Sequence, residues 1–120
     1  MPTGKSGKSR ALHICGNTRK VWDYFREMPI RAISLDNIMD LEEAKQELGG
    51  RMTIVGNIPP VECLLHGSEE ELRKEIREEV QKAAGSPKGY ISASGCDVPY
   101  QTDFAMLDSW MDEIRKISGL

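Results

Sequence analysis

The chain has 120 residues, 39% of them hydrophobic and 29% charged, which is typical of one globular domain and leaves no room for a second. Its net charge of −3 and the absence of interleaved basic and aromatic residues argue against nucleic-acid binding. No apolar run approaches the roughly 20 residues of a membrane span, and none follows the basic N-terminus as in a secretory signal. Since its three cysteines are then expected to be reduced thiols or metal ligands, we expect a cytoplasmic protein.

Residues 1–9 are expected to form a basic flexible tail, because they contain lysine and glycine but no large apolar residue beyond Met1. Residues 10–120 then repeat one unit four times: a short β-rich segment, a polar or glycine stop, and an amphipathic helix. The β-rich segments are residues 11–15, 31–35, 52–55 and 90–94. Four such units in a row predict a parallel sheet with right-handed crossovers.

The first two helices are predicted from periodicity and capping. Residues 18–28 carry their apolar side chains on one helical face and end before Pro29. The residues of that face are Val21, Trp22, Phe25 and Met28. Asp40 and Glu43 predict a capping box for a second helix, which runs through Leu48 and ends at two glycines.

The remaining helices follow the third and fourth strands. A short helical piece is expected at residues 61–65, and Ser68 with Glu71 predicts a capping box for a long helix that ends near Gly85. Thr102 is expected to cap the last helix. The predicted core stripes are Leu72, Ile76 and Val80 in the long helix, and Phe104, Leu107, Met111 and Ile114, with Trp110 alongside, in the last.

Two architectures fit four βα units: an open doubly wound sheet, or half of a TIM-type (β/α)8 barrel. Every predicted strand delivers small or polar groups to the same sheet edge, where both kinds of fold keep their active sites. The first strand is not followed by a glycine-rich dinucleotide fingerprint, which disfavours the doubly wound sheet. A complete barrel needs about 250 residues. We therefore expect a half-barrel.

His13, Cys15 and Cys96 are the candidate metal ligands. His13 and Cys15 lie two apart on a strand, so their side chains point the same way, and Cys96 follows the fourth strand. Imidazole with two thiolates suits Zn²⁺ and leaves the open fourth position of a catalytic site. In a flat sheet the first and fourth strands would be about 14 Å apart. A shared ion therefore requires the sheet to curl as it does in a barrel.

A non-metal interpretation is also open. A His-x-Cys pair on a strand is more often a packed histidine beside a buried free cysteine, and Cys63 is most simply a thiol of the core. Asp36 and Asn57 stand at neighbouring strand ends. Each is a candidate for orienting a substrate or a ligand histidine. For Asp36, capping or loop closure is the alternative role.

Several segments together resemble the C-terminal half of the uroporphyrinogen decarboxylase-like superfamily. They are His13-Ile14-Cys15-Gly16-Asn17-Thr18, Ser34-Leu35-Asp36, Glu43-Ala44-Lys45, Leu48-Gly49-Gly50, Gly56-Asn57-Ile58-Pro59-Pro60 and Ser94-Gly95-Cys96-Asp97-Val98-Pro99. The branch most similar in these motifs is that of the methylcobamide:coenzyme M methyltransferases, whose zinc ligands are a His-x-Cys pair and a distant cysteine. Decarboxylases of the superfamily place a histidine near the position of Cys96 and are not expected to carry that pair.

The resemblance implies a zinc-dependent methyltransferase with His13, Cys15 and Cys96 as ligands. A thiol of the coenzyme M type would bind the zinc as a thiolate, the better nucleophile, and take a methyl group from a methylcobamide on a corrinoid partner protein. Asp36 and Asn57 would be the catalytic residues that orient the thiol. The alternatives are a uroporphyrinogen decarboxylase-like lyase and a non-catalytic half-barrel that only binds metal or a partner chain.

A half-barrel leaves apolar strand faces uncovered, so the isolated chain is not expected to be a stable monomer. Either a homodimer or a separate N-terminal half-barrel would complete it. Closed two-fold dimers are the commonest way in which a protein covers such a surface.

Overall fold

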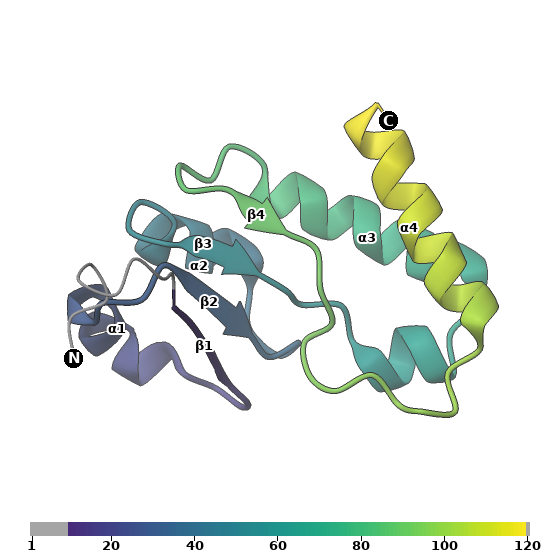
Figure 1. The fold of residues 1–120 in the computed structure, drawn as a ribbon, viewed down its shortest axis with the longest axis horizontal. Coiled ribbons are helices and arrows are strands. Elements are labelled where there is room, and N and C mark those ends of the chain that lie inside the picture. Colours follow the sequence, from purple (N-terminus) through teal and green to yellow (C-terminus); the bar gives the residue numbers. More distant parts are fainter. Residues whose placement is uncertain (1–9, 120) are drawn as a thin grey trace.

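The computed structural model describes residues 10–119, so the predicted tail at residues 1–9 lies outside the described residues. Four strands form one parallel sheet in the order β1-β2-β3-β4 (Figure 1). They are β1 (Ala11–Ile14), β2 (Ala32–Leu35), β3 (Thr53–Val55) and β4 (Tyr90–Ile91). Consecutive strands are neighbours throughout, which confirms the predicted half-barrel order and excludes a doubly wound sheet, where the order reverses.

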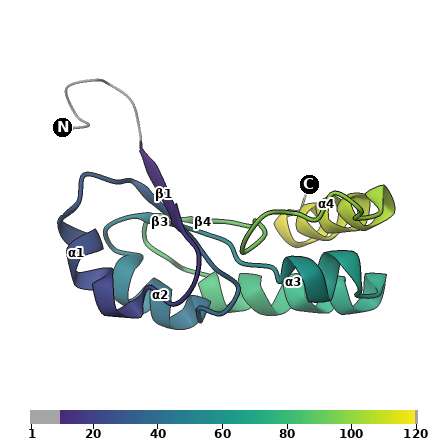
Figure 2. The ribbon, with the colours of Figure 1, turned by 90° about the horizontal axis from the view of Figure 1, so that it is seen from below.

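Helices cover one face of the sheet and leave the other open (Figure 2). In β2 the buried residues are Ile33 and Leu35, while Ala32 and Ser34 are half-buried on the opposite face. This period of two is what a strand imposes on alternate side chains. His13 pairs with Ser34 across β1 and β2. The polar side chains of these two strands therefore lie on the face that the helices do not cover.

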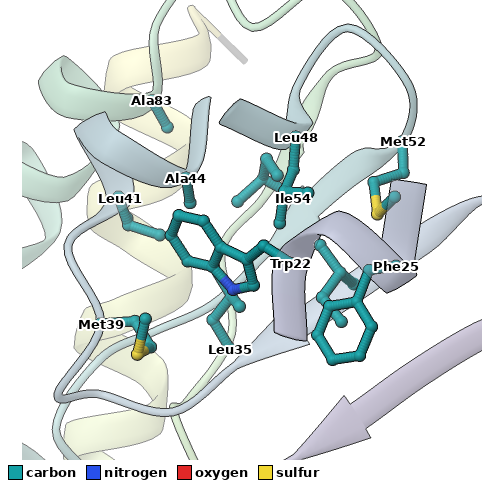
Figure 3. Packing of buried hydrophobic residues seen from close by; sticks show 11 residues of the cluster. Trp22, Phe25, Leu35, Met39, Leu41, Ala44, Leu48, Met52, Ile54 and Ala83 are labelled. Carbon is teal, nitrogen blue, oxygen red and sulfur yellow. The ribbon is translucent and has the colours of Figure 1, made fainter. Parts of the chain in front are cut away.

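The first helical segment begins as a 3-10 turn, Arg19–Val21, and continues as α1 (Trp22–Glu27). It is shorter than the predicted helix at residues 18–28, because Val21 and Met28, at its two ends, have non-helical backbone angles. Trp22 and Phe25 are buried as expected, whereas Val21 and Met28 are largely exposed. Figure 3 shows the Trp22 ring among Leu35, Leu41 and Ala44, the core between α1, α2 and the sheet.

Helix α2 (Leu41–Leu48) is capped by Asp40, whose carboxylate accepts a hydrogen bond from the Glu42 backbone N–H. The predicted cap at Asp40 is confirmed, but the predicted capping box with Glu43 is not formed. Glu43 does not return a bond to the cap, because its carboxylate pairs with Arg19 at 2.7 Å instead. That ion pair ties the segment before α1 to α2.

A π-helix, η3 (Pro60–Leu65), leads into the long helix α3 (Glu69–Ala83). The predicted capping box is confirmed: Ser68 accepts from the Glu71 N–H, and Glu71 accepts from the Ser68 N–H. Leu72 and Ile76 are fully buried. Cys63 lies in the same core, as expected for a thiol of the core, and burial raises its pKa to about 11.

Helix α4 (Phe104–Ser118) departs from prediction at its cap and on its buried face. Asp103, and not Thr102, caps it by accepting from the Ala105 N–H. Phe104 and Met111, expected in the core, are 80% and 52% exposed. Leu107, Trp110 and Ile114 are packed as predicted, and Met106 joins them. The helix packs against α3 beside the sheet and not on the sheet itself (Figure 2), so the inward stripe is rotated away from Phe104 and Met111.

An ion-pair cluster fixes the orientation of α4. Arg73 of α3 pairs with Asp112 and Glu113 of α4 at 2.9 and 3.0 Å. Glu113 is only 6% exposed, and Arg73 together with Arg77, which lies 3.5 Å away, balances its buried charge. Among residues 10–119, no helix is long and apolar enough to cross a membrane.

Candidate metal centre

The candidate ligands lie in β1 and in the segments that follow β1 and β4. β1 places His13 on the uncovered face of the sheet, and Cys15 follows directly after the strand. Cys96 lies in the segment between β4 and α4. The polypeptide after β4 brings the two ends of the sheet together.

The segment at residues 92–96 crosses the carboxyl ends of the strands toward β1 (Figure 1). Ile58 holds it at both sides: its N–H donates to Ala93 O at 2.9 Å, and its carbonyl accepts from the Gly95 N–H at 2.8 Å. Gly95 then passes against Asn37, the residue that follows β2 by two positions. The sequence led us to expect that only a curled sheet could bring Cys96 to the first strand. The crossing segment also shortens this distance, because it carries Cys96 past the ends of β3 and β2.

The three ligand atoms converge on one point. His13 Nε2 lies 3.3 Å from Cys15 Sγ, and Cys15 Sγ lies 3.2 Å from Cys96 Sγ. All three atoms are within 4.8 Å of one another. One imidazole nitrogen and two sulfurs gathered in this way are a donor set that suits a tetrahedral zinc ion with one position left for a further ligand. His13 and Cys15 are exposed, so that position is accessible from solvent.

Ser34, which sequence reasoning missed, orients the histidine. Its hydroxyl oxygen lies 2.8 Å from His13 Nδ1. When Nδ1 donates its proton to this oxygen, Nε2 keeps the lone pair that a metal ligand needs, and it faces the two sulfurs. Ser34 is the register partner of His13 in the neighbouring strand β2. Its position in the β-rich segment 31–35 was the signal that could have identified it.

Negative charges surround the Cys15 thiol. The hydrogen bond with Cys96 raises the pKa of the Cys15 thiol, and burial and the charges of Cys96, Asp36 and Asp97 act in the same direction. Two thiolates at this distance repel each other unless a cation lies between them. The arrangement therefore favours a bound cation that takes the place of the thiol protons.

Asp36 and Asn57 form hydrogen bonds that stabilise the loops next to the ligands. Asp36 accepts hydrogen bonds from the Gly16 N–H at 2.9 Å and the Ile38 N–H at 3.0 Å. The Asn57 amide donates to Asp36 O and Met39 O at 2.8 and 2.7 Å, and Asn57 is 3% exposed. These contacts correspond to the loop-closure role considered for Asp36, and a catalytic role for either residue stays a prediction.

Glu79 of α3 supports the same loops and gave no sequence signal. It is 4% exposed and accepts from the Asn57 N–H at 2.8 Å. Burial raises the pKa of Glu79 to about 8, and the neighbouring Glu75 adds to this, whereas the bond from Asn57 and the charge of Lys82 oppose it. The Tyr90 hydroxyl donates to Gly56 O of the same peptide bond. Residues 56–57 are thus held by the buried Glu79 and the half-buried Tyr90.

We expect Gly95→Ala to lower zinc affinity, because a Cβ there would lie 2.3 Å from Asn37 N and 2.8 Å from Asn37 Cα. Backbone cannot give way as a flexible side chain can, so the crossing segment must move and carry Cys96 away. A loss of about tenfold or more is expected, since ligand geometry sets metal affinity. Chelator competition measures it. Gly50→Ala is the matched control, because no atom lies within 4 Å of its added Cβ. Equal affinities in the two variants would contradict the proposed crossing.

Comparison with known proteins places the chain in a family. The family model for uroporphyrinogen decarboxylase (URO-D) matches residues 3–117. The chain belongs to the uroporphyrinogen decarboxylase family. This confirms the superfamily resemblance that the sequence motifs indicated.

Relatives of two activities match within this family. Uroporphyrinogen decarboxylase from Arthrobacter is 28% identical over 107 residues, and methylcobamide:CoM methyltransferase MtbA from Methanosarcina mazei is 29% identical over 101 residues. These alignments cover 89% and 84% of this chain but only 30% and 28% of the relatives. The chain thus spans less than a third of the length of these relatives. Identity at this level does not separate the two activities.

The fold likeness is stronger than the sequence likeness. A methyltransferase from Methanosarcina mazei superposes with a TM-score of 0.79 at 20% identity, over 92% of this chain and 32% of the methyltransferase. This agrees with four parallel βα units taken from a barrel of this family.

Proposed function

We propose that this chain carries the zinc-thiolate centre of a methyltransferase that moves a methyl group from a methylated corrinoid to a thiol of the coenzyme M type. The convergence of His13, Cys15 and Cys96 within 4.8 Å carries the proposal. A relative of the chain, MtbA, is a methylcobamide:CoM methyltransferase, and its two substrates support this pair for the chain. We also propose a cytoplasmic location.

His13, Cys15 and Cys96 would hold the zinc, which when bound would stabilise a substrate thiol as a thiolate. Ser34 would keep Nε2 of His13 directed at the metal. Asp36 holds the Gly16 N–H and so fixes the chain next to Cys15. Asn57 in turn donates to Asp36 O. We therefore propose that Asp36 and Asn57 position the ligand loops.

The methyl donor would be a methylcobamide carried by a corrinoid partner protein. The substrate sulfur forms the new carbon–sulfur bond, and the cobalt–carbon bond breaks with its electron pair left on cobalt. The rest of the barrel would come from a further N-terminal half-barrel or from a second copy of the chain. That remainder would close over the uncovered face of the sheet.

A decarboxylase-like lyase is the second candidate, because decarboxylases are among the relatives at similar identity. The two functions differ in their need for this centre. A lyase that does not use it would keep its activity when a chelator removes metal. A non-catalytic metal-binding chain would hold the ion and show no response to thiols.

Cobalt substitution tests the proposal. Co²⁺ takes the ligands of Zn²⁺ and reports its coordination by visible absorption. We expect the Co²⁺-loaded chain to show sulfur-to-metal charge-transfer bands, and added coenzyme M to change the spectrum, because its sulfur would enter the open position. No spectral response to coenzyme M would overturn the thiol-binding step. Absence of the charge-transfer bands would overturn the metal centre itself.

A further inference from the structure

The buried face of α3 contains one carboxylic acid, Glu79, which is 4% exposed. Its buried neighbours on this face are apolar: Leu72, Ile76 and Ala83. Within residues 10–119, Glu79 belongs to no ion pair. A carboxyl group buried without a basic partner costs stability that an apolar side chain of similar size would not. Packing alone therefore does not explain a glutamate at this position.

Glu79 is buried by this chain alone. Helix α3 lies on the side of the sheet that the helices cover (Figure 2). The further half-barrel or second copy proposed above would close over the opposite side, so the contacts of Glu79 do not depend on it. Glu79 is also outside the group of metal-ligating side chains. Any effect of Glu79 on the metal centre must therefore pass through other residues.

The Glu79 carboxyl group holds the peptide that joins Gly56 and Asn57. It accepts a hydrogen bond from the Asn57 N–H at 2.8 Å, and the Tyr90 hydroxyl donates to Gly56 O. This peptide follows β3 directly, and β3 lies between β2 and β4 in the sheet. Glu79 therefore fixes the backbone at the carboxyl edge of the sheet, between the strand ends that lead to the ligand loops.

One series of hydrogen bonds leads from this peptide to Cys15. The Asn57 side-chain amide donates to Asp36 O at 2.8 Å. The Asp36 carboxylate accepts from the Gly16 N–H at 2.9 Å, and Gly16 is the residue after Cys15. A shift of Asn57 would therefore release the loop that fixes the first thiol.

A second series leads from the same peptide to Cys96. Ile58 follows Asn57 directly, and its N–H donates to Ala93 O at 2.9 Å. The Ile58 carbonyl accepts from the Gly95 N–H at 2.8 Å, and Gly95 is the residue before Cys96. Both thiols of the metal centre are thus connected to the one peptide that Glu79 holds.

We propose that Glu79 is a positioning residue of the metal centre: by holding the Asn57 N–H, it keeps Cys15 and Cys96 close enough to share one ion. This inference rests on the proposed zinc-thiolate function and adds to it a residue that touches neither the ion nor the substrate. The role needs an acceptor oxygen at the right distance and no negative charge, because an amide oxygen also accepts from an N–H. Glutamine should therefore replace Glu79, whereas leucine should not.

Metal affinity and the Co²⁺ spectrum of Glu79 variants test the proposal at pH 7. Glu79→Leu should lower the Zn²⁺ affinity by about tenfold, as does loss of an outer hydrogen-bond partner at other metal sites. It should also change the sulfur-to-metal charge-transfer bands of the Co²⁺ form, because the two sulfurs move. Glu79→Asp should act in the same direction, since its carboxyl group is withdrawn by one methylene from the Asn57 N–H. Glu79→Gln should keep the affinity and the spectrum of the unchanged chain.

Ala83→Gly is the matched control for loss of stability. Ala83 lies one turn further along α3 and is 1% exposed, so glycine there destabilises the same helix and removes no hydrogen bond of residues 56–57. It should leave the metal affinity and the spectrum unchanged.

The positioning role is overturned if Glu79→Leu keeps the affinity and spectrum of the unchanged chain. It is equally overturned if Glu79→Gln or Ala83→Gly loses as much affinity as Glu79→Leu. Where Glu79→Leu does not fold, Glu79→Asp decides by the same two measurements. Absence of charge-transfer bands in the unchanged chain would overturn the metal centre and this inference together, which distinguishes that failure from a failure of the positioning role alone.

Discussion

Replacing Cys15 or Cys96 with serine should lower the zinc affinity of the chain by more than about 100-fold. A serine hydroxyl keeps its proton at neutral pH, so each change removes one anionic sulfur from a set of three ligands. Loss of an outer hydrogen-bond partner already costs about 10–100-fold in metal affinity, and loss of a ligand should cost more. Competition with a chromophoric chelator measures the change, and elemental analysis gives the stoichiometry, expected to be about one zinc per chain.

Cys63→Ser provides the control for this prediction. Cys63 is buried in the core of η3 and α3, outside the metal centre. Its replacement should leave zinc affinity unchanged and lower the free energy of unfolding by about 1–3 kcal/mol, since a hydroxyl enters an apolar site. Equal zinc retention in the three serine variants would exclude His13, Cys15 and Cys96 as the metal ligands.

Glu79→Gln should change how the stability of the chain depends on pH. The folded-state pKa of Glu79 is about 8, against 4.5 for an ordinary glutamate, so folding takes up a proton between these values. Stability from this group is therefore greatest below about pH 4.5, falls as pH rises, and is lowest above pH 8. The size of this fall is on the order of a few kcal/mol. Glutamine keeps an acceptor for the Asn57 N–H and does not titrate.

Urea unfolding at pH 5 and pH 8.5 measures this effect. The wild-type chain should lose stability between the two values by more than the Glu79→Gln variant, and the variant should be the more stable at pH 8.5. Glu78→Gln is the matched control, because Glu78 is the exposed neighbour on the same helix. If Glu79→Gln and Glu78→Gln shift the pH dependence equally, Glu79 does not titrate as its burial implies. At pH 5, Glu79→Leu should destabilise by about 1–3 kcal/mol, since the Asn57 N–H loses its acceptor.

The sequence by itself determined the features that depend on near neighbours along the chain. The strand predicted at residues 31–35 is present as β2, and the period of two in Ala32-Ile33-Ser34-Leu35 follows from strand geometry. The capping box of Ser68 and Glu71 is complete within four residues. The 1-2-3-4 strand order follows from short right-handed connections. His13 lies in β1 and Cys15 directly follows it, and this spacing of two residues brings their ligand atoms together.

Tertiary structure alone decided the features that depend on contacts between distant segments. The predicted face of α4 was wrong at Phe104 and Met111, because the helix packs against α3 and periodicity within a helix does not identify its neighbour. Cys96 reaches Cys15 because residues 92–96 cross the strand ends at Ile58 and Asn37. The physical reason is common to all of these: sequence periodicity fixes the direction of a side chain relative to its own element, while packing and register fix what that side chain meets.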